Sequence, residues 1–173
     1  RIMEYLVKEK YIDDERYASF FAKDKIRYNK WGRRKVEQAM WQKHIDADIQ
    51  RRVLDDVDEE EYLAILRPLL KSKRKAVKAS SDYEMNMKLI RFAMGRGFTM
   101  DIIRQCLDND EFDEISDEVI LLDIAINAND KKIRLKSTEK IENNEVLAEL
   151  LKNTDDKEII NKIITKEGFN DQE

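Results

Sequence analysis

The stretch KVEQAMWQKHIDADIQRRVL, residues 35–54, is repeated in plan 53 positions later as KLIRFAMGRGFTMDIIRQCL, residues 88–107. Each stretch has apolar residues at the spacing of one helix face, then a short break, then a second run at the same spacing. Asp46 and Thr99 stand where the second helix of each pair would begin, and both residue types cap helix N-termini well. The pattern predicts two copies of one helical pair. The matched apolar positions are Val36, Ala39, Met40, Ile49 and Val53 in the first copy and Leu89, Phe92, Ala93, Ile102 and Cys106 in the second.

A third helix is predicted before each pair, so the repeated unit contains three helices. The first of these helices spans residues 14–29 and the second spans residues 59–78. Pro68 lies inside the second and is expected to kink it or to end it near Arg67, because proline removes a backbone hydrogen bond. Asp13 is the expected N-cap of the first helix. The side chains expected to face inward are Tyr17, Phe20 and Phe21 in the first helix and Tyr62, Leu63, Leu66, Leu69 and Leu70 in the second.

Charge divides the chain into two segments. Residues 1–107 contain 24 Lys and Arg against 18 Asp and Glu, whereas residues 108–173 contain 9 against 19. The boundary at residues 108–118, DNDEFDEISDE, is interpreted as a linker because it is too acidic for a core element. Residues 1–10 are interpreted as the last helix of a preceding three-helix unit whose first two helices are absent.

The acidic segment contains a shorter repeat of its own. Residues 121–138 and 147–164 align at an offset of 26 and predict, in each copy, two short helices joined by an Asn/Asp turn. With 4 Gly and 1 Pro in 173 residues, the chain also lacks the turn residues of a β protein. The predicted fold is therefore all-α, with tandem three-helix repeat units over residues 1–107 and two-helix, solenoid-like repeats over residues 119–173.

Composition excludes several functional classes. Charged residues make up 40% of the chain, the mean hydropathy is -0.71, and no apolar run approaches the roughly 20 residues needed to cross a bilayer, so no membrane partner is expected. The single cysteine, Cys106, is expected in the core and fits a reducing compartment such as the cytoplasm. His44 has no partner at metal-ligand spacing. Without a nucleophile motif or a phosphate-binding glycine loop, neither enzyme activity nor a cofactor is expected, and Gly97 is expected to end a helix.

Three motifs occur in a defined order: YIDDERYASFF at residues 11–21, WGRRKVEQAMWQKHI at residues 31–45 and LIRFAMGRGFTMDIIRQCL at residues 89–107. In this order and spacing they resemble the RecX family, bacterial regulators of the RecA recombinase. The resemblance implies a non-enzymatic modulator built of tandem three-helix units. Such a protein lies along the groove of the RecA–DNA filament and restrains its ATPase and strand exchange. The resemblance supplies no catalytic residues.

Two features depart from the family pattern. His44 stands where the family usually has glycine, so a different backbone geometry is expected at that turn. Residues 108–173 are not expected in a RecX protein and resemble a short array of HEAT-like repeats. An alternative function is therefore a helical-repeat scaffold for protein interaction without recombinase activity.

Two basic clusters are the candidate binding residues. They are expected to contact the phosphates of single-stranded DNA or the acidic face of a RecA-type filament, and the alternative is a solvated helix surface that contacts nothing. Sequence-specific base reading is disfavoured, because no set of base-reading side chains is present. Trp31 and Trp41 are expected to pack at helix junctions, with partner contact as the alternative. The sequence indicates no oligomeric state. The candidate residues are Lys23, Lys25, Arg27, Lys30, Arg33, Arg34 and Lys35 in the first cluster and Lys71, Lys73, Arg74, Lys75 and Lys78 in the second.

Overall fold

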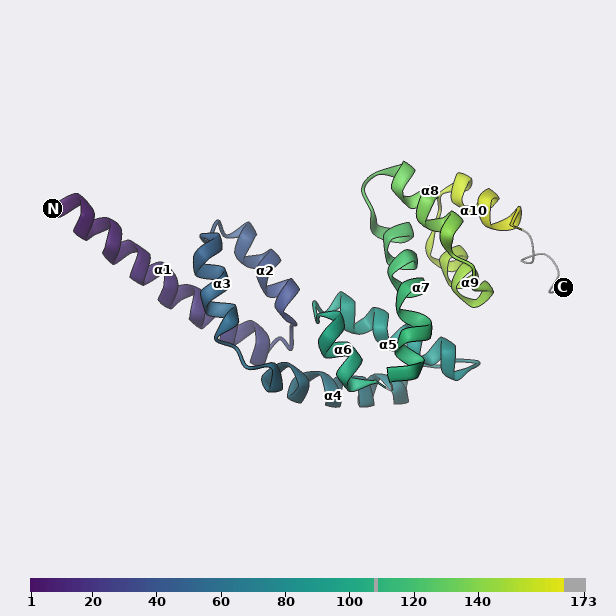
Figure 1. Cartoon of the computed structure of the whole chain (residues 1–173), viewed down its shortest axis with the longest axis horizontal. Helices are drawn as coiled ribbons and strands as arrows, with labels where there is room; N and C mark the ends of the chain where they lie inside the picture. Colours follow the sequence, from purple (N-terminus) through teal and green to yellow (C-terminus); the bar gives the residue numbers. More distant parts are fainter. Residues whose placement is uncertain (108, 167–173) are drawn as a thin grey trace. The chain divides into compact units, whose positions relative to one another are not determined.

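The computed structural model describes residues 1–107 and 109–166, and every regular element in these residues is an α-helix (Figure 1). The predicted all-α fold is confirmed. The helices are α1 (Ile2–Arg27), α2 (Arg33–Gln42), α3 (Ala47–Asp55), α4 (Glu59–Ala76), α5 (Asp82–Gly95), α6 (Met100–Cys106), α7 (Asn109–Asn127), α8 (Lys131–Lys140), α9 (Asn144–Asn153) and α10 (Lys157–Ile164).

The described chain forms two compact units, and one of the boundaries between them falls inside α5. The first unit contains Arg1–Val77 and the stretch that begins at Phe92. The second contains Lys78–Arg91 and the stretch that begins at Asn109. The N-terminal part of α5 therefore groups with the C-terminal helices, although the sequence assigned it to the first segment.

Helix α1 is continuous, so the expected break between residues 1–10 and a helix beginning at residue 14 is wrong. The stretch contains no glycine or proline, and Asp13 lies within the helix instead of capping it. Nothing in the local sequence ends the first helical run before the second begins.

The inward face of α1 also differs from the predicted one. Ala18, Ala22 and Ile26 are buried against α2 and α3, at the spacing of four that defines one helix face. Tyr17 and Phe20, which were expected to point inward, are exposed. Alanine side chains allow close approach between helix axes, and this packing displaces the larger rings to the outside.

Helix α4 continues through Pro68 and does not end near Arg67. Pro68 and Ala64 are both exposed, so water can bond to the carbonyl that proline leaves without a backbone donor. The opposite face forms the core as predicted. Its buried residues are Tyr62, Leu63, Leu66 and Leu70, with Leu69 half-buried.

The repeated pattern identifies most of the buried positions of the two helical pairs. The buried members are Val36, Met40, Ile49 and Val53 in the first pair and Leu89, Ala93 and Ile102 in the second. Ala39, Phe92 and Cys106 are only half-buried. The buried aromatic ring is instead Phe98, which is 1% exposed and begins the turn into α6.

The turns after α2 and after α5 have the same backbone hydrogen bonds, again 53 positions apart. Ile45 donates to the Met40 carbonyl at 3.1 Å, and Phe98 donates to the Ala93 carbonyl at 3.1 Å. His44 has a φ of 58° and Gly97 a φ of 88°, so both adopt the left-handed conformation that closes a helix C-terminus. The expectation of a different geometry at His44 is wrong. Histidine tolerates this region better than most residues with a side chain, at a cost in strain.

The two three-helix sets meet backbone to backbone, through residues that all belong to the first unit. The N–H of Gly32 donates to the Arg96 carbonyl at 2.8 Å, and the N–H of Arg34 donates to the Gly97 carbonyl at 2.9 Å. The Arg96 guanidinium adds a bond of 2.9 Å to the Asn29 carbonyl. Free N–H groups at the start of α2 thus find free carbonyls at the end of α5, two sets of groups that helices leave unpaired.

In the second unit, the expected acidic linker at residues 108–118 is wrong, because α7 begins at Asn109. Ile115, Val119 and Leu122 are buried at spacings of four and three, which is the period of a helix face. The acidic composition of this stretch therefore does not prevent it from contributing a buried side chain, Ile115.

The solenoid-like repeat is organised by side-chain caps at matching positions. The carboxylate of Asp130 accepts from the N–H of Lys132 at 2.7 Å, and 26 residues later Asp156 accepts from the N–H of Glu158 at 3.0 Å. Asn143 caps the intervening helix α9 in the same way. The ammonium of Lys166 donates to three carbonyls around the C-terminal end of α8, at 2.6–3.1 Å. Helix α8 therefore has hydrogen-bond partners at both of its ends.

Candidate functional site

The structure gathers aromatic rings and lysines into one stripe on α1 and α2. We call this set, Tyr17, Phe20, Phe21, Lys25, Trp31, Lys35 and Lys43, the basic–aromatic stripe. Tyr17 and Phe21 stack with ring centroids 6.2 Å apart. The Lys25 ammonium lies 5.5 Å from the Phe21 centroid and 5.5 Å from the Trp31 centroid. These distances place one cation between two rings, within the range of a cation–π contact.

Two further lysines complete the stripe. The Lys35 ammonium lies 4.7 Å from the Trp31 ring, and the Lys43 ammonium lies 5.4 Å from the Phe21 ring. Lys25 and Lys35 were predicted as site residues, whereas Lys43 was not. Trp31 is half-buried, as expected for a junction residue, but Trp41 is 67% exposed.

Arg33, a predicted site residue, is half-buried and paired with two carboxylates. Its guanidinium donates to Glu37 at 2.9 Å and to Asp55 at 2.7 Å, which joins α2 to the end of α3. Burial alone would lower the pKa of Arg33, but the two hydrogen bonds outweigh burial and raise it. Because its charge is already matched, Arg33 adds little to the field that a polyanion would meet.

Lys23 and Arg27 line a cleft between α1 and α3 whose positive and negative side chains balance. The same cleft holds Glu15, Asp55, Asp56 and Glu61 together with Arg16 and Arg52. Arg27 lies 3.7 Å from Glu61. Lys30 and Arg34 are exposed near the start of α2, and Lys30 has a φ of 57°. Of the first cluster, the structure thus brings Lys25 and Lys35 together with aromatic rings and leaves Lys30 and Arg34 exposed beside them in sequence.

The second basic cluster occupies the C-terminal end of α4 and the segment that follows. Lys73, Arg74 and Lys75 lie in the last turn, where positive charge complements the helix dipole. The Lys73 ammonium lies 4.8 Å from the Phe92 ring. Lys71 is exposed, and the exposed Lys78 belongs to the second unit. The two clusters therefore differ: the first contacts the rings of both Phe21 and Trp31, whereas the second lies at a helix C-terminus, with Lys73 over the Phe92 ring.

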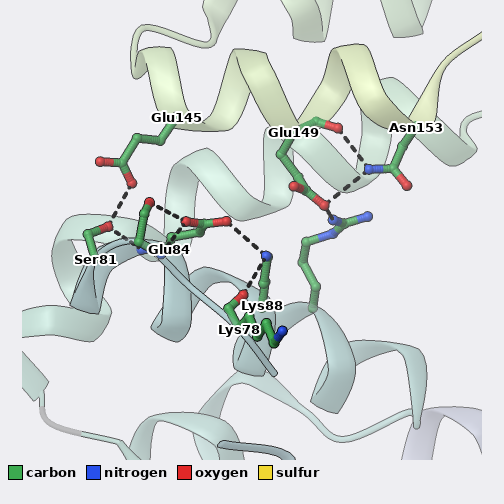
Figure 2. A network of polar contacts seen from close by, with 9 residues as sticks. Lys78, Ser81, Glu84, Lys88, Glu145, Glu149 and Asn153 are labelled. Atoms are coloured by element: carbon green, nitrogen blue, oxygen red, sulfur yellow. Dashed lines mark hydrogen bonds and ion pairs between the residues drawn. The ribbon is translucent and has the colours of Figure 1, made fainter. Parts of the chain in front are cut away.

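A polar network inside the second unit fixes the N-terminal part of α5 to α9 (Figure 2). The Arg91 guanidinium donates to Glu149 at 2.9 Å, and the Ser81 hydroxyl donates to Glu145 at 3.1 Å. The Arg91 and Glu149 side chains are 25% and 13% exposed, so solvent screens this ion pair less than a surface pair.

Glu84 organises the start of α5 in the same network. Its carboxylate accepts from the Lys88 ammonium at 2.8 Å and from the N–H of Ser80 at 2.8 Å. The hydrogen bond from Lys88, followed by those from Ser80, lowers the pKa of Glu84 to about 2. Glu84 therefore stays ionised at physiological pH, and we interpret the network as structural: it stabilises the start of α5.

Comparison with known proteins supports what the repeat pattern indicated. The family model for the second three-helix domain of RecX matches residues 13–54, and the model for the third three-helix domain matches residues 59–107. The chain belongs to the RecX family.

Individual relatives agree with this membership. "Regulatory protein RecX" of Clostridium perfringens strain SM101 is 32% identical over 116 residues, which cover 64% of this chain and 54% of the relative. The protein of the same name from Clostridium acetobutylicum is 30% identical over 111 residues, covering 62% of this chain and 51% of the relative. The chain thus spans about half the length of the relatives it matches. No solved structure matches it.

The two RecX domains correspond to the helix sets α1–α3 and α4–α6, and the matches end before α7. Residues 78–91 nevertheless lie within the third RecX domain and pack in the same unit as the C-terminal array. The array is therefore anchored on a RecX helix. Among residues 1–107 and 109–166, no group of three or more His, Cys, Asp or Glu side chains is placed to hold a metal ion. No helix in the described part of the chain is long and apolar enough to span a membrane.

Proposed function

We propose that this RecX-family chain binds the RecA–DNA filament and restrains its ATPase and strand exchange without catalysing a reaction of its own. The observation that carries the proposal is the ordered match of residues 13–54 and 59–107 to two successive RecX domains. The basic–aromatic stripe supports it, since Lys25, Lys35 and Lys43 offer positive charge to a polyanionic partner. We also propose that the chain acts in the cytoplasm, because a RecA–DNA filament forms where bacterial DNA lies.

In this proposal, the chain acts by occupying a surface. The stripe contacts single-stranded DNA phosphates or the filament that coats them, and the stack of helices spans neighbouring subunits. Arg33 has no role in contact, because its guanidinium is committed to Glu37 and Asp55. Loss of Arg33 therefore acts through stability, whereas loss of Lys25 or Lys35 acts through binding.

The test is inhibition of DNA-dependent ATP hydrolysis by a bacterial RecA. The chain is added to recombinase on circular single-stranded DNA, and the steady-state rate is measured. We expect a concentration-dependent fall in the rate, and a weaker fall for the double variant Lys25→Glu/Lys35→Glu. Lys152→Glu, an exposed lysine of α9, is the matched control and is expected to inhibit like the parent. An unchanged rate at saturating parent chain rejects the proposal.

A second candidate function, a protein-interaction scaffold, rests on the C-terminal array. Helices α7–α10 lie beyond the matched RecX domains and form a capped repeat of their own. Removal of this array would strip α5 of the contacts made by Arg91 and Ser81. Point variants on the outer surface of the array are therefore a cleaner test than deletion. If such variants leave ATPase inhibition intact but abolish capture of a protein partner, the scaffold function belongs to the array.

A further inference from the structure

The outer face of α1 carries aromatic rings that the core does not use. Phe20 is 80% exposed and Tyr17 is 51% exposed. At 100° per residue, the buried side of α1 is centred near Ala22, and Phe20 and Tyr17 point to nearly the opposite side. Burial within this unit therefore does not account for them. Large rings gathered on a solvated helix face are a mark of an interaction surface.

These rings form a shallow, open groove along the helix. Arg16, Tyr17, Phe20, Phe21 and Asp24 line it, all from one side of α1. Tyr17 and Phe21 are already stacked at an interplanar angle of 27°, so two of the rings are held in a fixed mutual orientation. The groove is too shallow to enclose a side chain of a partner, but its flat rings can stack against a planar ligand.

The groove continues into cations in a ratio close to one per ring. Tyr17, Phe20, Phe21 and Trp31 are the rings, and Arg16, Lys25, Lys35 and Lys43 are the cations beside them. Asp24, 3.7 Å from the Lys25 ammonium, offsets one of these charges in the free chain. A single-stranded nucleic acid has the same composition, one negative phosphate for each flat base. Proteins that bind such strands combine cations for the backbone with aromatic side chains on which successive bases stack.

We propose that Tyr17 and Phe20 form a stacking platform for unpaired bases of single-stranded DNA, with Lys25 and Lys43 contacting the adjacent phosphates. The inference takes DNA as the partner from the proposed function and adds base stacking to phosphate contact. Duplex DNA does not fit, because the flat faces of its bases are covered by the neighbouring bases and cannot stack on the rings of α1. An acidic protein surface would match the cations but gives no reason for one ring per charge.

The experiment measures DNA binding by the full chain alone, without recombinase. Two labelled oligonucleotides of equal length are compared, one of thymidines and one in which the central nucleotides are abasic, so that phosphates are kept and bases removed. The parent chain is expected to bind the thymidine strand more tightly by about 5- to 150-fold for each stacked base. Phe20→Ala and Tyr17→Ala are expected to lose this advantage while keeping the parent's affinity for the abasic strand.

Trp41→Ala is the matched control, because Trp41 is an exposed ring on α2 outside the stripe. It is expected to bind both strands like the parent. Phe20 is too exposed for its loss to unfold the chain, and an unchanged urea midpoint verifies this. Equal affinity of the parent for both strands, no binding to either, or a Phe20→Ala variant equal to the parent overturns the platform.

Two further outcomes separate this inference from the proposed function. If Phe20→Ala leaves both DNA affinities unchanged but weakens inhibition of the recombinase ATPase, the groove docks on protein, and the platform is rejected while the proposed function stands. If the parent shows the base-dependent advantage but never inhibits the ATPase, the platform stands and the proposed function fails.

Discussion

Gly32 is the position at which one methyl group should separate the two three-helix sets. A Cβ added there would lie 2.2 Å from the amide nitrogen of Phe98 and 2.4 Å from the carbonyl carbon and oxygen of Gly97. All three neighbours are backbone atoms, which cannot swing away as a flexible side chain does. The start of α2 and the turn after α5 must therefore move apart in Gly32→Ala.

The magnitude follows from what that movement disturbs. The hydrogen bonds from Gly32 and Arg34 to the carbonyls of Arg96 and Gly97 are each worth about 0.5–1.5 kcal/mol net. Overpacking at a close contact costs about 1–3 kcal/mol more. We expect Gly32→Ala to lower the free energy of unfolding by about 2–6 kcal/mol in total.

The assay is urea unfolding followed by tryptophan fluorescence. Both tryptophans, Trp31 and Trp41, belong to the first unit, so the signal reports this unit alone. Gly95→Ala is the control, because nothing lies within 4 Å of the Cβ it would add. Gly95 is the last residue of α5, and its replacement by alanine is expected to be neutral or stabilising by up to about 1 kcal/mol. If Gly32→Ala unfolds at the same urea concentration as Gly95→Ala, the backbone contact is not what joins the two sets.

Three other predictions concern single side chains. Phe98→Ala should lower the free energy of unfolding by about 3–5 kcal/mol because the ring is 1% exposed, and Phe92→Ala should cost clearly less, so equal losses in urea would contradict the assigned core. His44→Gly should raise the free energy of unfolding by about 0.5–1 kcal/mol, because relief of the left-handed strain at residue 44 exceeds the cost of the greater entropy of the unfolded chain. A lower urea midpoint than the parent's would refute this. Glu84→Gln should destabilise the second unit at neutral pH. Because the pKa of Glu84 in the folded chain, about 2, lies below the ordinary value of 4.5, the difference in stability from the parent should disappear as pH falls from 4.5 to 2. Thermal unfolding monitored by circular dichroism measures this difference.

Local patterns in the sequence predicted the helical pairs and their ends. The cap at Asp46, whose carboxylate accepts from the N–H of Asp48 at 2.9 Å, and the left-handed Gly97 both follow from the chemistry of a few neighbouring residues. The 53-residue repeat fixed most buried positions for the same reason. Features of this kind need no knowledge of what packs against the helix.

Features that depend on distant partners were not predictable in this way. The large rings of Tyr17 and Phe20 favoured them as core residues, whereas α1 packs through Ala18 and Ala22. Hydrophobicity scales barely distinguish a buried alanine from an exposed one. Arg33 was counted as a free cation although Glu37 lies one helical turn away, and its second partner, Asp55, lies 22 residues away and is brought close only by the fold. Net charge concealed the apolar period through Ile115 in α7.

Because α1 is long, this one helix allows the stability of packed turns to be compared with that of unpacked turns. Side chains of its first nine residues, Ile2–Lys10, are exposed, whereas its last turns pack against α2 and α3. Isolated helices shorter than about 12–15 residues are marginal in water. Amide hydrogens along this one helix should therefore exchange with solvent ever more slowly from the Ile2 end to the Arg27 end. A partner that lay against the projecting turns would be detected as new protection there, even without any change in the overall helix content.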